Sequence, residues 1–329
     1  MKWLFDLLGI TATPSANALD EAIEHVVDGI DPRLRLVPGY RRLLQPSLQK
    51  TLAHIDDTVD RIHGPLGLDR KAYFNEPEVK ALFASPDELD NLLRDSSEIT
   101  SFLHKTQQTT AQEAWALLCV SKEEKNILGM QLSGNAIRRD VPQTAINFYD
   151  HKLMVPSDNE DSVRSGMKKC IFDGIITYAL QHIIGLKAQR RELEDQRRIL
   201  HARLRARQSM GNGLTSLLAT AQNTAAPISD IESDLHKTEE LLQQLPASAN
   251  VLGAYLEEIR QILNHPEEFI QMDTGCFRVS NIGIKVDTDS TDTANTVCYS
   301  ELEIAQVLKR VVAIVHFPCN LTNSNESIR

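Results

Sequence analysis

The chain has 329 residues, of which 42% are hydrophobic and 5% aromatic, and its formal net charge is −10 at pH 7. This length and apolar content suffice for about two domains with a mainly aliphatic core, and they exclude a wholly disordered chain. The acidic balance excludes nucleic-acid binding over the whole surface, so any such binding must be local.

The N-terminal part shows the spacing of amphipathic helices. Apolar residues recur at helical intervals over 17–30 and 46–63. The stretches Asn75-Glu-Pro-Glu78 and Ser85-Pro-Asp-Glu88 have the form of helix starts, and a further helix is expected from Thr110 through Trp115 and Leu118. We therefore expect a helical bundle over residues 1–125.

Two apolar runs could be read as a signal peptide or as a membrane-spanning helix. The first, near the N-terminus, contains Asp6, which a signal peptide seldom tolerates, so a short amphipathic helix that docks on the body is expected there. The second run, over 170–186, is too short to span a bilayer and contains Asp173 and His182. No transmembrane segment is predicted.

Two regions have the character of β-strands. NILGMQL (126–132) and TAINFYDHKLMV (144–155) suggest two strands, paired or nearly so. FRVSNIGIKVD (277–287) and RVVAIVHF (310–317) suggest further strands, while 297–309 is ambiguous between strand and helix. Each region has too few strands for an independent sheet, so we expect the two to share one small sheet.

Long helices are expected between these regions. Residues 185–208 contain eight positive and three negative side chains, a balance of 8 − 3 = +5. The helix 230–245 contains five acidic side chains against Lys237, or −4, and both helices have an apolar seam. Opposite charges beside apolar seams predict a coiled-coil-like helical hairpin. In that hairpin, the stems of Arg190 and Arg197 would cover the seam while their guanidiniums reach carboxylates.

The predicted fold class is thus α+β and mostly α, with an N-terminal helical bundle, a small mixed or antiparallel sheet and a long helical hairpin inserted into it. The predicted domain limits are 1–125 for the bundle, 126–158 with 271–318 for the sheet region, and 159–270 for the hairpin. Residues 319–329 are expected to form a disordered tail.

The five cysteines have wide spacings and include no CxxC pair. We interpret them as buried or idle thiols in a reducing cytosol, which predicts a cytoplasmic protein without a disulfide framework.

Two groups of side chains are candidates for chemistry. On a helix, Asp56, Asp60 and His63 would lie on one edge and could hold a divalent metal. No supporting motif accompanies them, so a solvated helix face is the favoured interpretation, and no metal or other cofactor is predicted. The second group is Arg138, Asp140 and His151, which flank the predicted strand pair and could form an anion or acid–base site. Ordinary surface ion pairs are the favoured alternative there.

Three functions remain open. The leading hypothesis is a cytoplasmic interaction or scaffold protein that uses the helical hairpin for assembly with a protein partner or with itself. The second is an enzyme with a site near Arg138, Asp140 and His151. The third is a nucleic-acid-binding protein that uses the basic helix 187–207. Hairpin pairing explains the basic run without nucleic acid, so the third hypothesis is disfavoured.

Overall fold

The computed structural model describes residues 16–106, 113–133, 136–211, 228–245, 251–280, 283–286, 294–305 and 308–319. The chain divides into two compact units. The first comprises Met1–Ala22, Leu48–Ile175 and Asn264–Arg329, and the second comprises Ile23–Ser47 and Ile176–Leu263. The predicted N-terminal helix lies outside the described residues, and so does the predicted tail apart from Cys319.

Three long helices run through both units: α2 (Ala16–Ile30), α3 (Tyr40–Asp60) and α8 (Glu160–Gly211). The described part of the first unit also has five short helices, which are α4 (Arg70–Asn75), α5 (Pro77–Leu82), α6 (Pro86–Asp95), α7 (Ser97–Thr106) and α11 (Pro266–Phe269). The predicted start at Ser85 is confirmed, because the Ser85 hydroxyl accepts a hydrogen bond from the Glu88 N–H at 3.1 Å. At the other predicted start, the helix is capped by Glu76 without a side-chain hydrogen bond.

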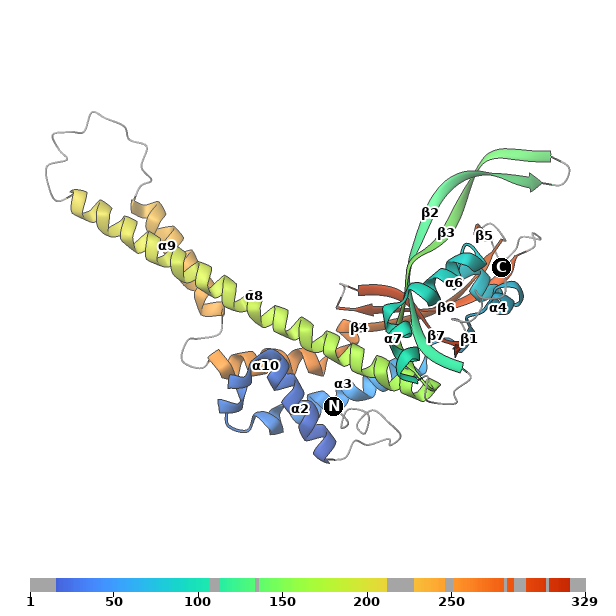
Figure 1. Cartoon of the computed structure of the whole chain (residues 1–329). Coiled ribbons are helices and arrows are strands. Elements are labelled where there is room, and N and C mark those ends of the chain that lie inside the picture. Colours follow the sequence, from blue (N-terminus) through green and yellow to red (C-terminus); the bar gives the residue numbers. More distant parts are fainter. Residues whose placement is uncertain are drawn as a thin grey trace. The chain divides into compact units, whose positions relative to one another are not determined.

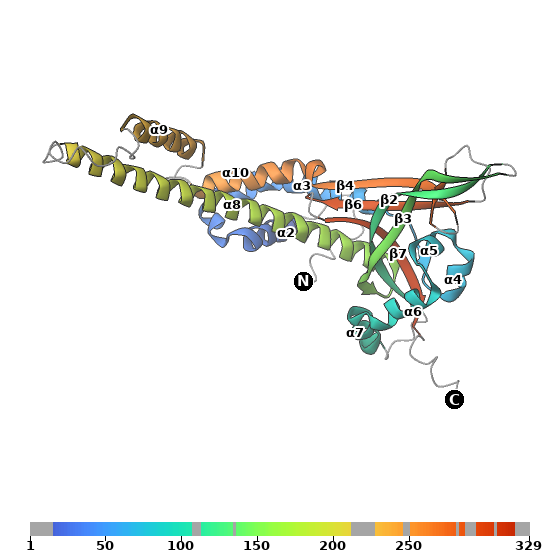
Figure 2. The ribbon, with the colours of Figure 1, turned by 90° about the horizontal axis from the view of Figure 1, so that it is seen from above.

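The first unit is built on a seven-stranded sheet (Figures 1 and 2). Its strands are β1 (Leu66–Gly67), β2 (Glu113–Ser133), β3 (Ala136–Ser157), β4 (Ile270–Val279), β5 (Lys285–Val286), β6 (Asn295–Ile304) and β7 (Leu308–Pro318). The order is β3-β2-β7-β6-β4-β5, and all these neighbours are antiparallel. Strand β1 adds to β7 in parallel.

The prediction of a small sheet is therefore wrong, although the class is α+β. One cause is the segment around Trp115 and Leu118, which was expected to be helical and forms the buried first part of β2 instead. The ambiguous segment 297–309 is mostly strand β6. The prediction that the two strand-bearing regions share one sheet is confirmed, because β2 and β3, which contain the strands expected over 126–155, belong to the same sheet as β4, β6 and β7.

One face of the sheet carries an apolar core. Helices α5, α6 and α7 contact strand β3 on this side. The core contains alternate residues of the central strands, including Ala114, Ala116, Leu118 and Val120 of β2 and Val311, Ala313, Val315 and Phe317 of β7. This alternation follows from the two-residue period of a strand.

A disulfide joins two neighbouring strands of the sheet. Cys276 of β4 and Cys298 of β6 are directly opposite in the register and are bonded, with 4.1 Å between their Cα atoms. The expectation of five idle thiols is therefore wrong for this pair. Cys119, Cys170 and Cys319 are free thiols. Burial raises the pKa of Cys119 to about 12, so its thiol is protonated and unreactive at neutral pH.

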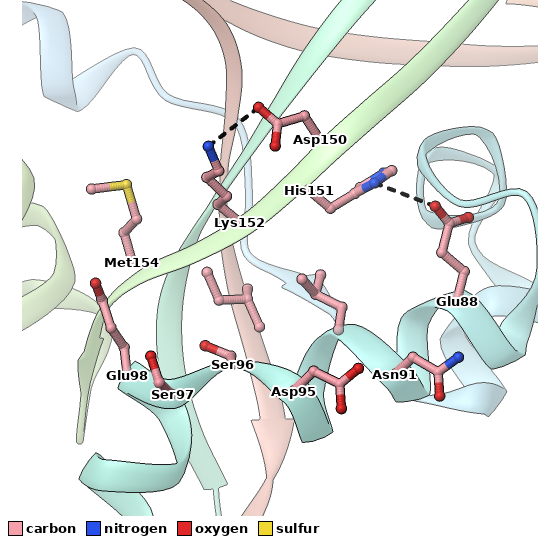
Figure 3. A pocket seen from close by; sticks show the side chains of 12 residues that line it. Glu88, Asn91, Asp95, Ser96, Ser97, Glu98, Asp150, His151, Lys152 and Met154 are labelled. Carbon is pink, nitrogen blue, oxygen red and sulfur yellow. Dashed lines mark ion pairs between the residues drawn. The ribbon is translucent and has the colours of Figure 1, made fainter.

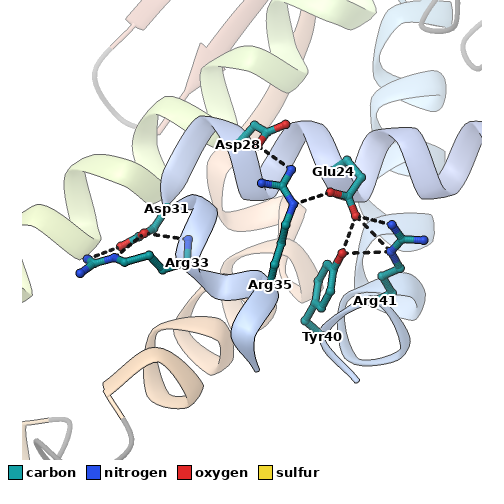
Figure 4. A network of polar contacts seen from close by, with 7 residues as sticks. All are labelled: Glu24, Asp28, Asp31, Arg33, Arg35, Tyr40 and Arg41. Carbon is teal, nitrogen blue, oxygen red and sulfur yellow. Dashed lines mark hydrogen bonds and ion pairs between the residues drawn. The ribbon is translucent and has the colours of Figure 1, made fainter. Parts of the chain in front are cut away.

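The second unit consists of helices. With parts of α2, α3 and α8 it contains the 3-10 turn η1 (Pro32–Leu36), α9 (Ile228–Gln244) and α10 (Val251–Asn264). A polar network links α2 to the start of α3 (Figure 4). In this network, Glu24 accepts hydrogen bonds from Tyr40 and Arg35. The Tyr40 hydroxyl is the main reason why the pKa of Glu24 lies below its usual value, although partial burial opposes it.

The predicted helical hairpin corresponds to α8 and α9, which run alongside each other in Figure 1 and are joined by an ion pair, 3.9 Å, between His201 and Glu239. On α9 the less exposed positions are Ile231, Leu235, Thr238 and Leu242, and Leu245 directly after the helix continues their alternating four- and three-residue spacing. Ile228, at the start of the expected seam, is 42% exposed instead. As predicted, the guanidinium of the half-buried Arg190 reaches a carboxylate, that of Glu194 on the same helix, at 2.9 Å. The role predicted for Arg197 is wrong, because Arg197 is exposed.

Candidate functional site

The most distinctive feature of the first unit is a two-stranded ribbon. Strand β2 pairs with β7 only up to Val120, and from there to Ser133 its sole strand partner among the described residues is β3. We call residues 121–133 and 136–149 the ribbon. In Figure 1 the two green strands continue together beyond the point at which β2 leaves β7. The part of the ribbon near the sheet contacts the segment just before β5, since the Ile146 N–H donates to the Gly283 carbonyl at 2.9 Å and Ala145 forms a bridge with Ile284.

Three β-bulges interrupt the pairing of β2 with β3. The register shifts occur between Trp115 and Leu117, between Cys119 and Ser121, and between Gly129 and Gln131. In each case β3 contributes one residue more than β2. Each extra stretch of β3 contains a residue with positive φ: Asp140 at 57°, Asp150 at 54° and Val155 at 54°. Aspartate tolerates this conformation, whereas for a β-branched valine it is an outlier.

The predicted enzyme residues occupy two of these bulges and do not converge. Asp140 is exposed in the outer bulge, and His151 lies in the next one. The two are 11 residues apart (151 − 140) on one extended strand, or roughly 35 Å at about 3.3 Å per residue. The backbone of Arg138 pairs with Gln131, and its side chain lies outside the described residues.

His151 borders a cavity of about 660 Å³ between β3 and helices α6 and α7. Figure 3 shows the lining, which comprises Glu88, Asn91, Leu92, Asp95, Ser96, Ser97, Glu98, Asp150, His151, Lys152, Leu153 and Met154. The buried His151 ring stacks on Phe83 with 4.7 Å between ring centroids. Its Nε2 donates to the Leu82 carbonyl at 2.7 Å, and its Nδ1 lies 3.4 Å from Glu88.

His151 and Asp150 of this cavity are engaged in contacts that hold neighbouring elements together. With Nε2 bonded to a carbonyl and Nδ1 facing Glu88, His151 ties β3 to the α5–α6 region. Asp150 is held by Arg310 of β7 at 2.6 Å and by Lys152 at 3.3 Å. The Arg310 hydrogen bond is the main reason why the pKa of Asp150 lies below its usual value. Among the side chains that line this cavity, no hydroxyl or thiol is paired with His151 as a nucleophile would be.

The metal candidates are also separated. Helix α3 ends at Asp60, so His63 does not continue the helical edge that Asp56 and Asp60 share. Asp56 pairs with Lys168 at 2.8 Å, and His63 lies 3.3 Å from Glu78. Within the described part of the chain, no cluster of three or more His, Cys, Asp or Glu side chains could hold a metal ion.

The basic stretch of α8 is divided between internal ties and exposed side chains. Lys187 pairs with the buried Asp31 at 3.1 Å, and the half-buried Arg190 pairs with Glu194 at 2.9 Å. The exposed cations are Arg191, Arg197, Arg198, Arg203 and Arg205. Internal ion pairs therefore account for only part of the positive charge of this stretch.

The exposed apolar side chains of the ribbon were not predicted from the sequence. Leu128 is 71% exposed, Met130 67% and Ile127 38%. The run 126–132 has apolar residues at both odd and even positions, which is typical of a strand buried on both faces. This run of apolar residues is the sequence signal that could have identified the surface, because among the described strands only β3 pairs with it.

No family model, no curated protein and no solved structure matches the chain. None of the described helices combines the length and the hydropathy needed to cross a bilayer.

Proposed function

We propose that this protein is an assembly protein that binds a protein partner through its ribbon. The observation that carries the proposal is the exposure of Leu128 and Met130 on β2, beyond the point at which β7 ceases to pair with that strand. A hairpin of two strands is at best marginally stable in water, and more strands or a packing partner stabilise it. Exposed apolar side chains grouped on such an element are typical of interaction sites.

The ribbon is a better candidate than the helical hairpin, which the sequence favoured for assembly. The seam positions of α9 are the less exposed ones, with Ile231 and Thr238 buried within the chain. These buried seam positions offer a partner less apolar surface than Leu128 and Met130 do, although Ile228 at the start of the seam is 42% exposed. The cavity at His151 is a weaker candidate, because His151 and Asp150 are engaged in hydrogen bonds and ion pairs.

Site-specific photo-crosslinking in cells tests this function. A photoreactive amino acid at position 128 should form crosslinks to protein, and the same amino acid at position 74 serves as the control. Leu128 and Phe74 are matched, since each is 71% exposed, but Phe74 lies on the short helix α4. Crosslinks at 128 that exceed those at 74 support the proposal. Equal or absent crosslinking at 128 would contradict it.

A second candidate function is supported by the exposed cations of α8. Arg191, Arg198 and Arg205 recur every seven residues, and all three are exposed. Such residues lie on one side of a helix, roughly 10 Å apart at about 1.5 Å rise per residue. A line of cations of this kind can neutralise phosphates of a nucleic acid.

Duplex binding at several salt concentrations tests the second candidate. Binding by α8 should weaken steeply as salt rises, and Arg191→Glu with Arg198→Glu should abolish it. Because Arg197 lies on another side of the helix, Arg197→Glu is the control for the change of charge. Absence of duplex binding at low salt would rule out this function.

A further inference from the structure

The two long edges of the ribbon differ in their capacity to accept another strand. The β3 edge is interrupted by the bulges at Asp140 and Asp150, and it contains Pro142, which has no N–H to donate. It is also partly occupied, because Ile146 bonds to Gly283. Bulges and proline are the devices with which natural sheets block an edge.

The β2 edge has none of these obstacles. All three bulges add their extra residue to β3, so β2 keeps a regular course from 121 to 133. Its outer part, 126–132 (NILGMQL), contains neither a charge nor a proline. β7 pairs with β2 only up to Val120, so from Ser121 onward β2 lacks this neighbour. A regular, uncharged and proline-free edge is the kind to which another strand adds.

We propose that two copies of this chain pair antiparallel through their β2 edges and form a continuous sheet in the order β3-β2-β2-β3. This inference names the partner of the proposed function and rests on it. Such a contact is isologous, because each copy offers the same edge. It also doubles the number of strands in the ribbon, which removes the weakness of an isolated hairpin.

The charges of β2 select the register. With the twofold axis at Gly129, Leu128 of each copy lies opposite Met130 of the other, so the two most exposed apolar side chains among those described on the strand meet on one face. Lys125 then lies opposite Ser133. An axis shifted to Asn126 would instead place Glu124 opposite Leu128 and leave Met130 opposite Lys122. Cross-strand apolar pairs stabilise a sheet, so the axis at Gly129 is favoured.

The opposite face of β2 supports the same choice. The Gln143 side chain lies over Gly129, where its Oε1 would be only 1.9 Å from a Cβ atom. The Gln143 amide donates to the Met130 carbonyl at 3.2 Å. The ribbon thus covers the Gly129 face itself and leaves the Leu128 and Met130 face bare.

The test begins with the mass of the purified full-length chain by light scattering. The expected result is a dimer of the 36.9 kDa chain. The double variant Leu128→Lys with Met130→Lys places like charges opposite each other and should raise the dimer Kd by about tenfold or more. Phe74→Lys, at an equally exposed position on α4, should leave the Kd unchanged. Circular dichroism should show that all variants are folded.

Disulfide crosslinking then tests the register, in a chain carrying Cys170→Ser and Cys319→Ser. A mixture of Leu128→Cys chains and Met130→Cys chains should crosslink under mild oxidation. A mixture of Ile127→Cys and Met130→Cys chains should not, because these positions face opposite sides of the strand. Absence of the 128–130 crosslink in a dimer would overturn the register.

Self-pairing and the proposed function fail in different ways. A monomer at high concentration whose position 128 still crosslinks to another protein in cells would overturn self-pairing and leave the proposed function intact. A dimer that the double lysine variant does not weaken would overturn β2 pairing. A monomer without any crosslink at position 128 would overturn both.

Discussion

Lys187 lies 3.1 Å from Asp31, a residue 156 positions earlier in the chain. Its ammonium also lies 5.1 Å from the centroid of the Tyr255 ring. The first cation of the basic stretch therefore ties α8 to η1 and to α10 inside the second unit. Asp31 is buried, and it also accepts hydrogen bonds from the backbone and the guanidinium of Arg33.

Replacing this carboxylate should destabilise the second unit in a pH-dependent way. The Arg33 hydrogen bond is the main reason why the pKa of Asp31 lies well below its ordinary 3.8. A lowered folded-state pKa stabilises the fold fully above the ordinary pKa, and this stabilisation is lost as pH falls below it. We expect Asp31→Asn to lower the free energy of unfolding at neutral pH by roughly 1–3 kcal/mol.

Urea unfolding of the Asp31→Asn variant and of the parent protein checks this expectation. The difference between the two should be constant from neutral to mildly acidic pH and should shrink as pH falls below 3.8. A difference that grows on acidification would contradict the assignment. Asp28→Asn removes a more exposed partner of Arg35 and should have a much smaller effect.

Two glycines of α8 provide a matched pair. A Cβ atom on Gly166 would lie 2.1 Å from a methyl group of Val155, whereas a Cβ on Gly185 would meet nothing within 4 Å. Gly166→Ala should therefore destabilise the protein by about 1–3 kcal/mol through overpacking. Gly185→Ala should stabilise it by up to about 1 kcal/mol, because alanine favours the helix. Thermal unfolding measures both, and equal shifts would contradict the close approach of α8 to the Val155 bulge.

The Cys276–Cys298 bond should stabilise the sheet of the first unit. It closes a loop with a sequence separation of 22, for which chain entropy predicts a stabilisation of roughly 3 kcal/mol. Reduction should lower the denaturant midpoint of the parent protein but not that of Cys276→Ser with Cys298→Ser. Alkylation of unreduced, unfolded protein should modify three cysteines, since Cys119, Cys170 and Cys319 are free. Alkylation of all five would show that the bond does not form.

Substitutions on the buried and exposed sides of α9 should differ in their effect on the stability of this helix. Ile231 is 7% exposed, whereas Leu241 of the same helix is 46% exposed. Ile231→Ala should cost roughly 2–4 kcal/mol of local stability, and Leu241→Ala should cost little. Hydrogen exchange of α9 amides measures this, and equal effects would show that α9 does not pack through the predicted seam.

The helices were largely predictable because their signals are local. The spacing of apolar residues over 160–207 and 230–245 corresponds closely to α8 and α9. The long strand β3 was not predictable in full, because each bulge reverses the alternation of its faces. Its 22 residues contain three bulges, so no single two-residue period runs through it.

The candidate site was predicted in part. The polar groups around Asp140 and His151 do coincide with bulges, but a single strand holds them far apart, a relationship that spacing alone does not reveal. The Cys276–Cys298 pair depends on the register of β4 with β6, and the exposure of Leu128 depends on where β7 leaves β2. Both features depend on contacts between segments far apart in the chain, so a short window of sequence does not reveal them.

The position of β7 has a consequence for synthesis. β7 lies between β2 and β6 in the sheet, yet it follows every other strand of the sheet along the chain. As the polypeptide leaves the ribosome, the β2–β3 hairpin emerges early, and the β4–β6 pair emerges after the long helices. The strand that joins these halves, β7, is translated last. Because Val120 of β2 pairs with Val311 of β7, almost 200 further residues are translated before the edge of β2 that pairs with β7 can be covered. Nascent chains with such an edge depend on chaperones or on slow collapse to avoid mispairing, and a chain stopped before Leu308 would leave two halves of a sheet without their common strand.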